Sequence, residues 1–170
     1  LNTRYKRAEA GFILRKSGAK LLFCIDKFLD TDYPGMLDDE DLPELREIVL
    51  LRPQADLSQR KNSEKHTAWQ DFLNSGNAIA AAEIDKAAQA VGADDTADIL
   101  FTSGTTGAPK GVMAGHSQNL RTFGYWAQVV GLEPGDRYLI IGPFFHTFGY
   151  KAGLLTALMC GCTALPHLVF

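Results

Sequence analysis

The sequence contains few cysteines, no long apolar run and no excess of basic residues. Its three cysteines are too few for the disulfide framework of a small secreted domain. No stretch of about 18 apolar residues occurs, so the sequence predicts no membrane-spanning helix. The 17 basic residues stand against 20 acidic ones, a net charge of −3. This balance argues against a protein that binds nucleic acid through general electrostatics.

The first residues carry neither an initiator methionine nor a signal peptide. The chain starts at Leu1, and no apolar region follows the charges of residues 4–7. We therefore expect the chain to begin inside a larger protein. The lack of a disulfide framework leads us to expect that protein to be cytoplasmic.

Two of the cysteines, Cys160 and Cys162, form a Cys-x-Cys pair. No second pair or histidine cluster accompanies them, so we expect no zinc site. They lie in the apolar segment 154–165, which predicts that both are buried as small hydrophobic residues.

Short apolar segments alternate with amphipathic segments along the chain. The apolar segments predict strands at residues 20–25, 47–51, 98–101, 111–114 and 137–141. The amphipathic ones predict helices at residues 5–16, 66–74, 77–91, 117–130 and 150–159. We expect Thr3 to cap the first helix and Gly18 to end it. The alternation indicates an α/β fold with a largely parallel sheet flanked by helices.

Two polar segments separate these elements, and two helices show apolar faces. Residues 30–41 are expected to form a loop, and residues 52–65 to be mobile. One face of helix 77–91 carries Ile84, Ala87, Ala88 and Val91. The inward face of helix 117–130 carries Leu120, Phe123, Ala127 and Val130.

A loop rich in glycine and hydroxyl groups follows the predicted strand 98–101. Residues 102–111 read Thr-Ser-Gly-Thr-Thr-Gly-Ala-Pro-Lys-Gly. Glycines bring backbone N–H groups close to a ligand, hydroxyls donate to phosphate oxygens, and Lys110 adds a positive charge. No aspartate or glutamate lies between Ile99 and Leu132, so a polyanion would meet no repulsion from this segment. The loop therefore predicts phosphate binding.

This loop differs from two common phosphate-binding motifs. The Walker motif, Gly-x-x-x-x-Gly-Lys-Ser/Thr, would need its second glycine where Pro109 stands. The loop does not match Gly-x-Gly-x-x-Gly either. A flexible turn of glycine and threonine between two strands is the simpler alternative.

The ten-residue loop resembles the signature loop of the adenylate-forming superfamily of acyl-CoA synthetases, peptide-synthetase adenylation domains and beetle luciferases. Its pattern, Ser/Thr-Ser-Gly-Ser/Thr-Thr-Gly-x-Pro-Lys-Gly, is matched at every position. Residues 2–4, 13–20 and 143–149 resemble three further segments of that superfamily. Residues 144–153 are most similar to actinobacterial ligases of fatty acids or steroid-ring propanoates.

The resemblance implies a reaction in two halves. A carboxylate attacks the α-phosphate of Mg–ATP to give an acyl-adenylate, and coenzyme A then displaces AMP to give a thioester. The implied ligands of the pyrophosphoryl end are Thr102, Ser103, Gly104, Thr105, Thr106, Gly107 and Lys110. Lys110 is also implied as a catalytic residue, because it would stabilise charge on the leaving pyrophosphate. The Thr102 hydroxyl is implied to approach the magnesium ion.

The resemblance also implies that His146 lies at the acid pocket, near the carboxylate being activated. The other implied wall residues are Phe145, Thr147, Phe148 and Gly149, and an aromatic lining suits an apolar acid. His146 is expected to position and gate the acid as a catalytic residue. The alternative is simple packing among phenylalanines. A general base is not required, because a carboxylate is already ionised at pH 7.

The resemblance implies that residues 1–170 are an internal fragment of the superfamily's large N-terminal domain. We expect the start of that domain, its remainder and the C-terminal domain to lie outside the chain, and the chain alone to be inactive. An unpaired strand edge near residues 165–170 would then allow oligomers.

Two other functions remain open. One is an amino-acid adenylation domain of a peptide synthetase, although His146 stands where an aspartate-containing motif is usual. The other is a binding module that uses the phosphate loop without catalysis.

Overall fold

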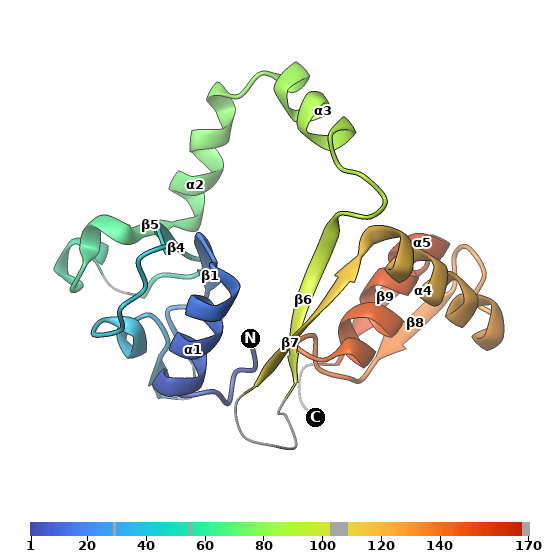
Figure 1. Cartoon of the computed structure of the whole chain (residues 1–170), viewed down its shortest axis with the longest axis horizontal. Coiled ribbons are helices and arrows are strands. Elements are labelled where there is room, and N and C mark those ends of the chain that lie inside the picture. The colour runs from blue at the N-terminus through green and yellow to red at the C-terminus, as the bar shows by residue number, and fades with distance from the viewer. Residues whose placement is uncertain (29, 55, 103–108, 168–170) are drawn as a thin grey trace. The chain divides into compact units, whose positions relative to one another are not determined.

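The computed structural model describes the whole chain except Leu29, Ala55 and residues 103–108 and 168–170. The chain forms two compact units (Figure 1). One unit comprises Thr3–Ala90, and the other comprises Val91–Phe170 with Leu1–Asn2. Among the described residues, no helix has the length and apolar character that crossing a bilayer requires.

A three-stranded parallel sheet, ordered β1-β4-β5, organises the Thr3–Ala90 unit. Strand β1 (Leu21–Cys24) pairs with β4 (Glu47–Leu50), which pairs with β5 (His66–Ala68). Helix α1 (Arg7–Ser17) precedes β1 and ends at Gly18, whose φ of 63° is a left-handed conformation that suits glycine.

The core of this unit lies between α1 and one face of the sheet. Residues alternate along β1, so that Leu22 and Cys24 pack against the core while Leu21 and Phe23 are exposed. The buried core residues are Ala10, Leu14, Leu37, Leu42, Leu45, Ile48 and Leu50.

Short elements complete the Thr3–Ala90 unit. Strands β2 (Lys27–Phe28) and β3 (Thr31–Asp32) form a small antiparallel ladder. Helix α2 (Trp69–Ser75) follows β5, and its Phe72 ring lies 5.2 Å from Phe23 of β1. The remaining elements are the 3-10 turns η1 (Gly35–Leu37), η2 (Leu57–Gln59), η3 (Ser63–Lys65) and η4 (Gly76–Ala78), and helix α3 (Ala81–Gln89).

The Val91–Phe170 unit begins with an antiparallel hairpin of β6 (Thr96–Thr102) and β7 (Lys110–Gly115). Helix α4 (His116–Val130) follows β7 directly and ends at Gly131, with φ at 71°. The two strands run side by side in Figure 1, and α4 continues from the end of β7.

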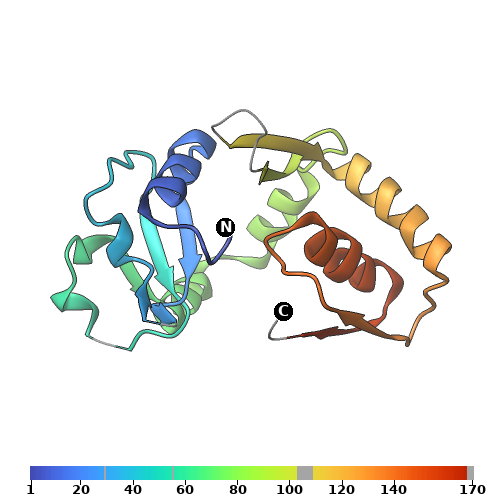
Figure 2. The same cartoon turned by 90° about the horizontal axis from the view of Figure 1, so that it is seen from below.

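A parallel pair of strands forms the rest of this unit. Strand β8 (Arg137–Ile140) pairs with β9 (Thr163–Pro166). The connection between them is a π-helix, η5 (Phe148–Leu155), followed by α5 (Thr156–Cys160). Figure 2 shows this helical connection lying against β8 and β9. The α/β prediction with parallel strands is therefore confirmed.

Two local predictions in the first unit were wrong. Residues 66–68 form strand β5 instead of a helix, since they pair with β4. The N-cap of α1 is Lys6, so Thr3 does not cap that helix. The Lys6 backbone N–H donates instead to the Glu9 carboxylate at 3.1 Å.

Burial also differs from the predicted faces. Ile84 of α3 is exposed, as is the rest of that helix, because an apolar stripe alone does not supply a partner. In α4, Ala127 is buried while Leu120 and Val130 are exposed. The cysteine pair 160 and 162 is half-buried, not buried.

The two polar segments contain more structure than expected. Residues 30–41 hold β3 and η1, and residues 52–65 hold η2 and η3. Within the second segment, the Arg60 guanidinium forms an ion pair with Asp26, a residue only 1% exposed. The mobility of that segment stays a prediction.

Candidate active site

The hairpin of β6 and β7 holds the base of the predicted phosphate loop. Thr102, the last residue of β6, pairs with Lys110, the first residue of β7. The Thr102 hydroxyl donates to the Lys110 carbonyl oxygen at 3.5 Å, and both residues are exposed. The two ends of the loop, each with a predicted phosphate ligand, therefore lie side by side.

The middle of the predicted loop lies outside the described residues. This applies to Ser103, Gly104, Thr105, Thr106 and Gly107. Their role as phosphate ligands stays a prediction.

Gly111, at the exit of the loop, is required by packing. A Cβ atom there would lie 2.9 Å from Ile99 and 3.2 Å from Phe101, both on the neighbouring strand β6. The glycine therefore lets β7 approach the apolar face of β6, which keeps the loop's two ends in register.

The acid-side segment 143–149 forms a tight turn after β8. The His146 backbone N–H donates to the Pro143 carbonyl oxygen at 3.0 Å, and the His146 carbonyl accepts from Tyr150 at 2.9 Å. Gly149 is buried, and a Cβ atom there would come within 2.6 Å of the Gly142 carbonyl carbon. The turn therefore depends on a glycine at 149, so this predicted wall residue contributes backbone only.

The predicted acid-side side chains differ in exposure. His146, Thr147 and Phe148 are exposed, and Phe145 is half-buried. The Phe148 ring meets Trp126 of α4 edge to face, with the ring centroids 6.1 Å apart. In the described chain, His146 is therefore exposed, and its choice between positioning the acid and simple packing stays a prediction.

The acid-side turn continues directly into the π-helix η5. Such helices are rare and often occur at functional sites. Side chains bind two of its carbonyls: the Thr156 hydroxyl donates to Lys151 at 2.9 Å, and the Tyr138 hydroxyl donates to Ala152 at 3.0 Å. The Trp126 indole donates to Tyr138 in turn, at 3.3 Å.

Sequence reasoning missed a buried polar cluster beneath this turn. The Lys151 ammonium lies 2.8 Å from the Asp98 carboxylate and 2.8 Å from the Asn119 amide oxygen. The available signal was one charged residue inside each of two apolar segments, strand 98–101 and helix 150–159. A lone charge in such a segment indicates a paired, buried group.

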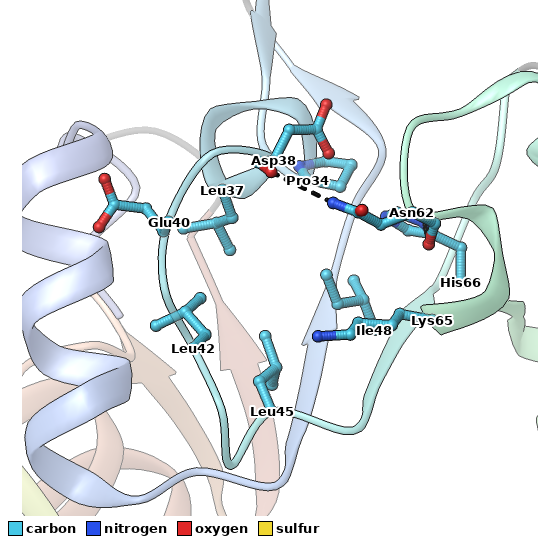
Figure 3. A pocket seen from close by; sticks show the side chains of 10 residues that line it. All are labelled: Pro34, Leu37, Asp38, Glu40, Leu42, Leu45, Ile48, Asn62, Lys65 and His66. Atoms are coloured by element: carbon cyan, nitrogen blue, oxygen red, sulfur yellow. Dashed lines mark hydrogen bonds between the residues drawn. The ribbon is translucent and has the colours of Figure 1, made fainter.

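A small cavity in the Thr3–Ala90 unit is a poor candidate for a ligand site. Figure 3 shows apolar side chains on one side of it and Asn62 on the other, where the Asn62 amide donates to the Asp38 carbonyl at 3.2 Å. Its volume of about 30 Å³ suits water, not a nucleotide or an acid. Its lining residues are Pro34, Leu37, Asp38, Glu40, Leu42, Leu45, Ile48, Asn62, Lys65 and His66.

The sequence as a whole matches one enzyme family. The family model of AMP-binding enzymes matches residues 1–167. The chain therefore belongs to the AMP-binding enzyme family.

Two curated relatives share more than the family pattern. The chain is 44% identical over 170 residues to a methyl-dioxo-octahydro-indenyl-propanoyl:CoA ligase of Mycobacterium tuberculosis, covering 100% of this chain and 32% of the relative. It is 40% identical over 174 residues to the ligase of the same name from Rhodococcus jostii, an alignment that covers 100% of this chain and 33% of that relative. The chain thus spans about a third of the length of these relatives. Their names agree with the predicted resemblance to actinobacterial propanoate ligases.

Solved structures support the fold. An anthranilate CoA ligase in complex with anthranoyl-AMP has a TM-score of 0.75 at 24% identity, over 96% of this chain and 29% of that one. A red-emitting luciferase from Phrixothrix hirtus has a TM-score of 0.71 at 23% identity, over 100% of this chain and 31% of that one.

Proposed function

We propose that this chain is part of a longer acid–CoA ligase, within its N-terminal domain. That enzyme activates an apolar carboxylic acid with Mg–ATP and then forms an acyl-CoA thioester. The observation that carries the proposal is the 44% identity to a propanoyl:CoA ligase along all 170 residues. The three free cysteines are consistent with a reducing compartment, and a cytoplasmic location belongs to the same proposal.

The phosphate loop acts on the nucleotide in this proposal. Residues 102–107 and Lys110 hold the pyrophosphoryl end of ATP. The acid oxygen bonds to the α-phosphorus as the bond to pyrophosphate breaks, and negative charge moves onto the leaving group. The Lys110 ammonium and the loop donors stabilise that charge. The side-by-side positions of Thr102 and Lys110 at the hairpin support this role.

Magnesium fits this arrangement as an ion that arrives with ATP. In such sites magnesium takes most of its ligands from phosphate oxygens and water. The exposed Thr102 hydroxyl is a suitable additional oxygen. Across the part of the chain that the structure describes, no group of three or more His, Cys, Asp or Glu residues could hold a metal alone.

The turn after β8 acts on the acid. His146 positions the carboxylate, and no base is needed, because that carboxylate is ionised at neutral pH. Phe148 is 58% exposed and offers apolar area to the acid, with Trp126 supporting its ring. The named relatives favour an acid that carries a propanoate on an oxidised bicyclic ring.

The second half-reaction transfers the acyl group. The sulfur of coenzyme A attacks the acyl carbon, the bond from that carbon to AMP breaks, and the thiol proton leaves to solvent. Residues that bind coenzyme A belong to the longer protein in this proposal.

The test is acid-dependent pyrophosphate exchange by the full-length protein that contains this chain. We expect exchange with ring-bearing propanoates and fatty acids, and little with free amino acids. Lys110→Ala should raise the barrier to adenylate formation by about 2–4 kcal/mol. Lys86→Ala, at an exposed lysine of α3, is the control and should leave exchange unchanged. Exchange with amino acids alone would identify a peptide-synthetase domain, and unchanged exchange in Lys110→Ala would remove the loop from the reaction.

A further inference from the structure

Three polar side chains meet in the interior of the Val91–Phe170 unit. They are Asp98 of β6, Asn119 of α4 and Lys151 of η5. The Lys151 ammonium lies 2.8 Å from both Asp98 Oδ1 and Asn119 Oδ1. The Asn119 amide donates to Asp98 Oδ2 at 2.7 Å, which closes the triangle.

This triangle is buried, and the ion pair with Lys151 is the contact of Asp98 Oδ1, which accepts no hydrogen bond from the described residues. The side chains of Lys151 and Asp98 are only 7% and 11% exposed, and Asn119 is also buried. Removing a charge pair from water is costly, and an apolar replacement is often as stable. A buried pair of this kind is therefore weak evidence for added stability, and a role in fixing one geometry is the hypothesis tested below.

The cluster joins the two halves of the candidate site. Asp98 lies on the strand that ends at Thr102, the start of the phosphate loop. Lys151 lies five residues after His146, inside the π-helix that follows the acid-side turn. The side chain of Lys151 is tied to β6, while its carbonyl is bound by the Thr156 hydroxyl.

Besides Lys151, the turn around His146 is held by the Phe148 contact with Trp126 and by the Tyr138 hydroxyl on the Ala152 carbonyl. His146, Thr147 and Phe148 are exposed, and the turn reaches the unit's interior through Gly149 and Lys151. A shift of η5 would therefore move His146 and Phe148 together, and a displacement of about 1 Å costs up to about 100-fold in an enzyme site.

We propose that Lys151 is a positioning residue for the acid, which holds the His146 turn in place through Asp98 and Asn119. Lys151 itself contacts no substrate. The inference rests on the proposed ligase function and adds a determinant of acid binding to it.

The test uses full-length protein with three variants, Lys151→Met, the double variant Asp98→Asn/Lys151→Met, and the exposed-lysine control Lys86→Met. Lys151→Met leaves the Asp98 carboxylate without a countercharge, whereas the double variant removes both charges. KM for the acid and for Mg–ATP are measured by pyrophosphate exchange, and Tm by thermal unfolding. We expect Lys151→Met to raise the acid KM about 10- to 100-fold, with the ATP KM changed less than about twofold.

The double variant separates positioning from stability. We expect it to recover most of the Tm lost in Lys151→Met while the acid KM stays raised. A stability role alone would lower the active fraction with both KM values unchanged, and that result would overturn the inference. Failure of both Lys151 variants to fold would also overturn the inference, because the cluster would then serve stability. A wild-type protein without exchange for any acid would instead reject the proposed function itself.

Discussion

Gly149 lies where the turn after β8 passes against the start of the π-helix. The Gly142 and Pro143 carbonyls occupy the space that a side chain at 149 would need. We expect Gly149→Ala to lower the free energy of unfolding by about 1–3 kcal/mol, because the turn must shift to admit a methyl group. Urea denaturation measures this change.

Gly124 in α4 provides the matched control for that substitution. A Cβ atom there would have Met159 Cε as its nearest neighbour, at an ordinary 3.8 Å. Gly124→Ala should therefore be neutral or stabilise the helix by up to about 1 kcal/mol. Equal effects at the two positions would contradict the close backbone approach at Gly149.

At the scale of elements, one carboxylate ties α1 to the loop that follows η1. Glu40 accepts hydrogen bonds from Arg15 at 2.8 Å and from Arg7 at 2.7 Å, one near each end of α1. These bonds lower the pKa of Glu40 below its usual 4.5. The close approach also needs Gly11, where a Cβ atom would come within 2.9 Å of the Glu40 carboxyl carbon.

The lowered pKa makes part of the stability dependent on pH. The unfolded chain binds a proton at Glu40 more readily than the folded one, so this contribution is present above about pH 4.5. It is lost as the pH falls through the lower folded pKa. Urea denaturation between pH 6 and 3 should show wild type more stable than Glu40→Gln at pH 6, with the difference shrinking on acidification.

Glu44→Gln is the control for this titration, because Glu44 is an exposed residue of the same loop. A difference between wild type and Glu40→Gln that stays constant down to pH 3 would show that the two arginines do not act through the ionised carboxylate.

Element prediction succeeded where local signals dominated. The apolar strands β1 and β4 lie where they were expected. Helices α1 and α4 end at Gly18 and Gly131, because glycine readily adopts the left-handed conformation that ends a helix. It failed at β5, because pairing with β4 outweighed the local helical pattern. The helix predicted at residues 150–159 is present as η5 and α5, but the π-helical form of its first part was not predicted.

At the scale of the whole molecule, the chain covers about a third of its curated relatives and includes a short set of predicted ATP ligands. A few charge-assisted hydrogen bonds, worth about 1.5–3 kcal/mol each, must offset the cost of immobilising a flexible nucleotide. We expect the 170-residue chain alone to bind ATP with a Kd of about 1 mM or weaker.

Calorimetric titration of the chain with Mg–ATP checks this affinity. Inorganic pyrophosphate should bind comparably, because the contacts predicted here are to phosphates. Micromolar binding of ATP alone would reveal an adenosine site within these residues. The oligomer expected through the edge near residues 165–170 stays a prediction for sedimentation analysis of the same sample.

The sequence by itself determined the chemistry that depends on residue type and short spacing. Glycines, hydroxyls and Lys110 within ten residues predicted a phosphate loop, and the family match agrees with that prediction. The acid-side role of His146 came from the resemblance of segment 143–149 to the superfamily, and it stays a prediction. Such signals are readable because backbone freedom, hydrogen-bonding capacity and charge are properties of the residues themselves.

Tertiary structure alone decided which distant residues contact one another and which contacts fix the candidate site. Lys151 lies 53 positions from Asp98 in the chain, and their ion pair forms only when β6, α4 and η5 pack together. The same packing leaves His146 exposed and leaves no free space for a side chain at Gly149. Local sequence patterns do not carry this information, because the free energy of a buried charge depends on partners that folding brings together from distant segments.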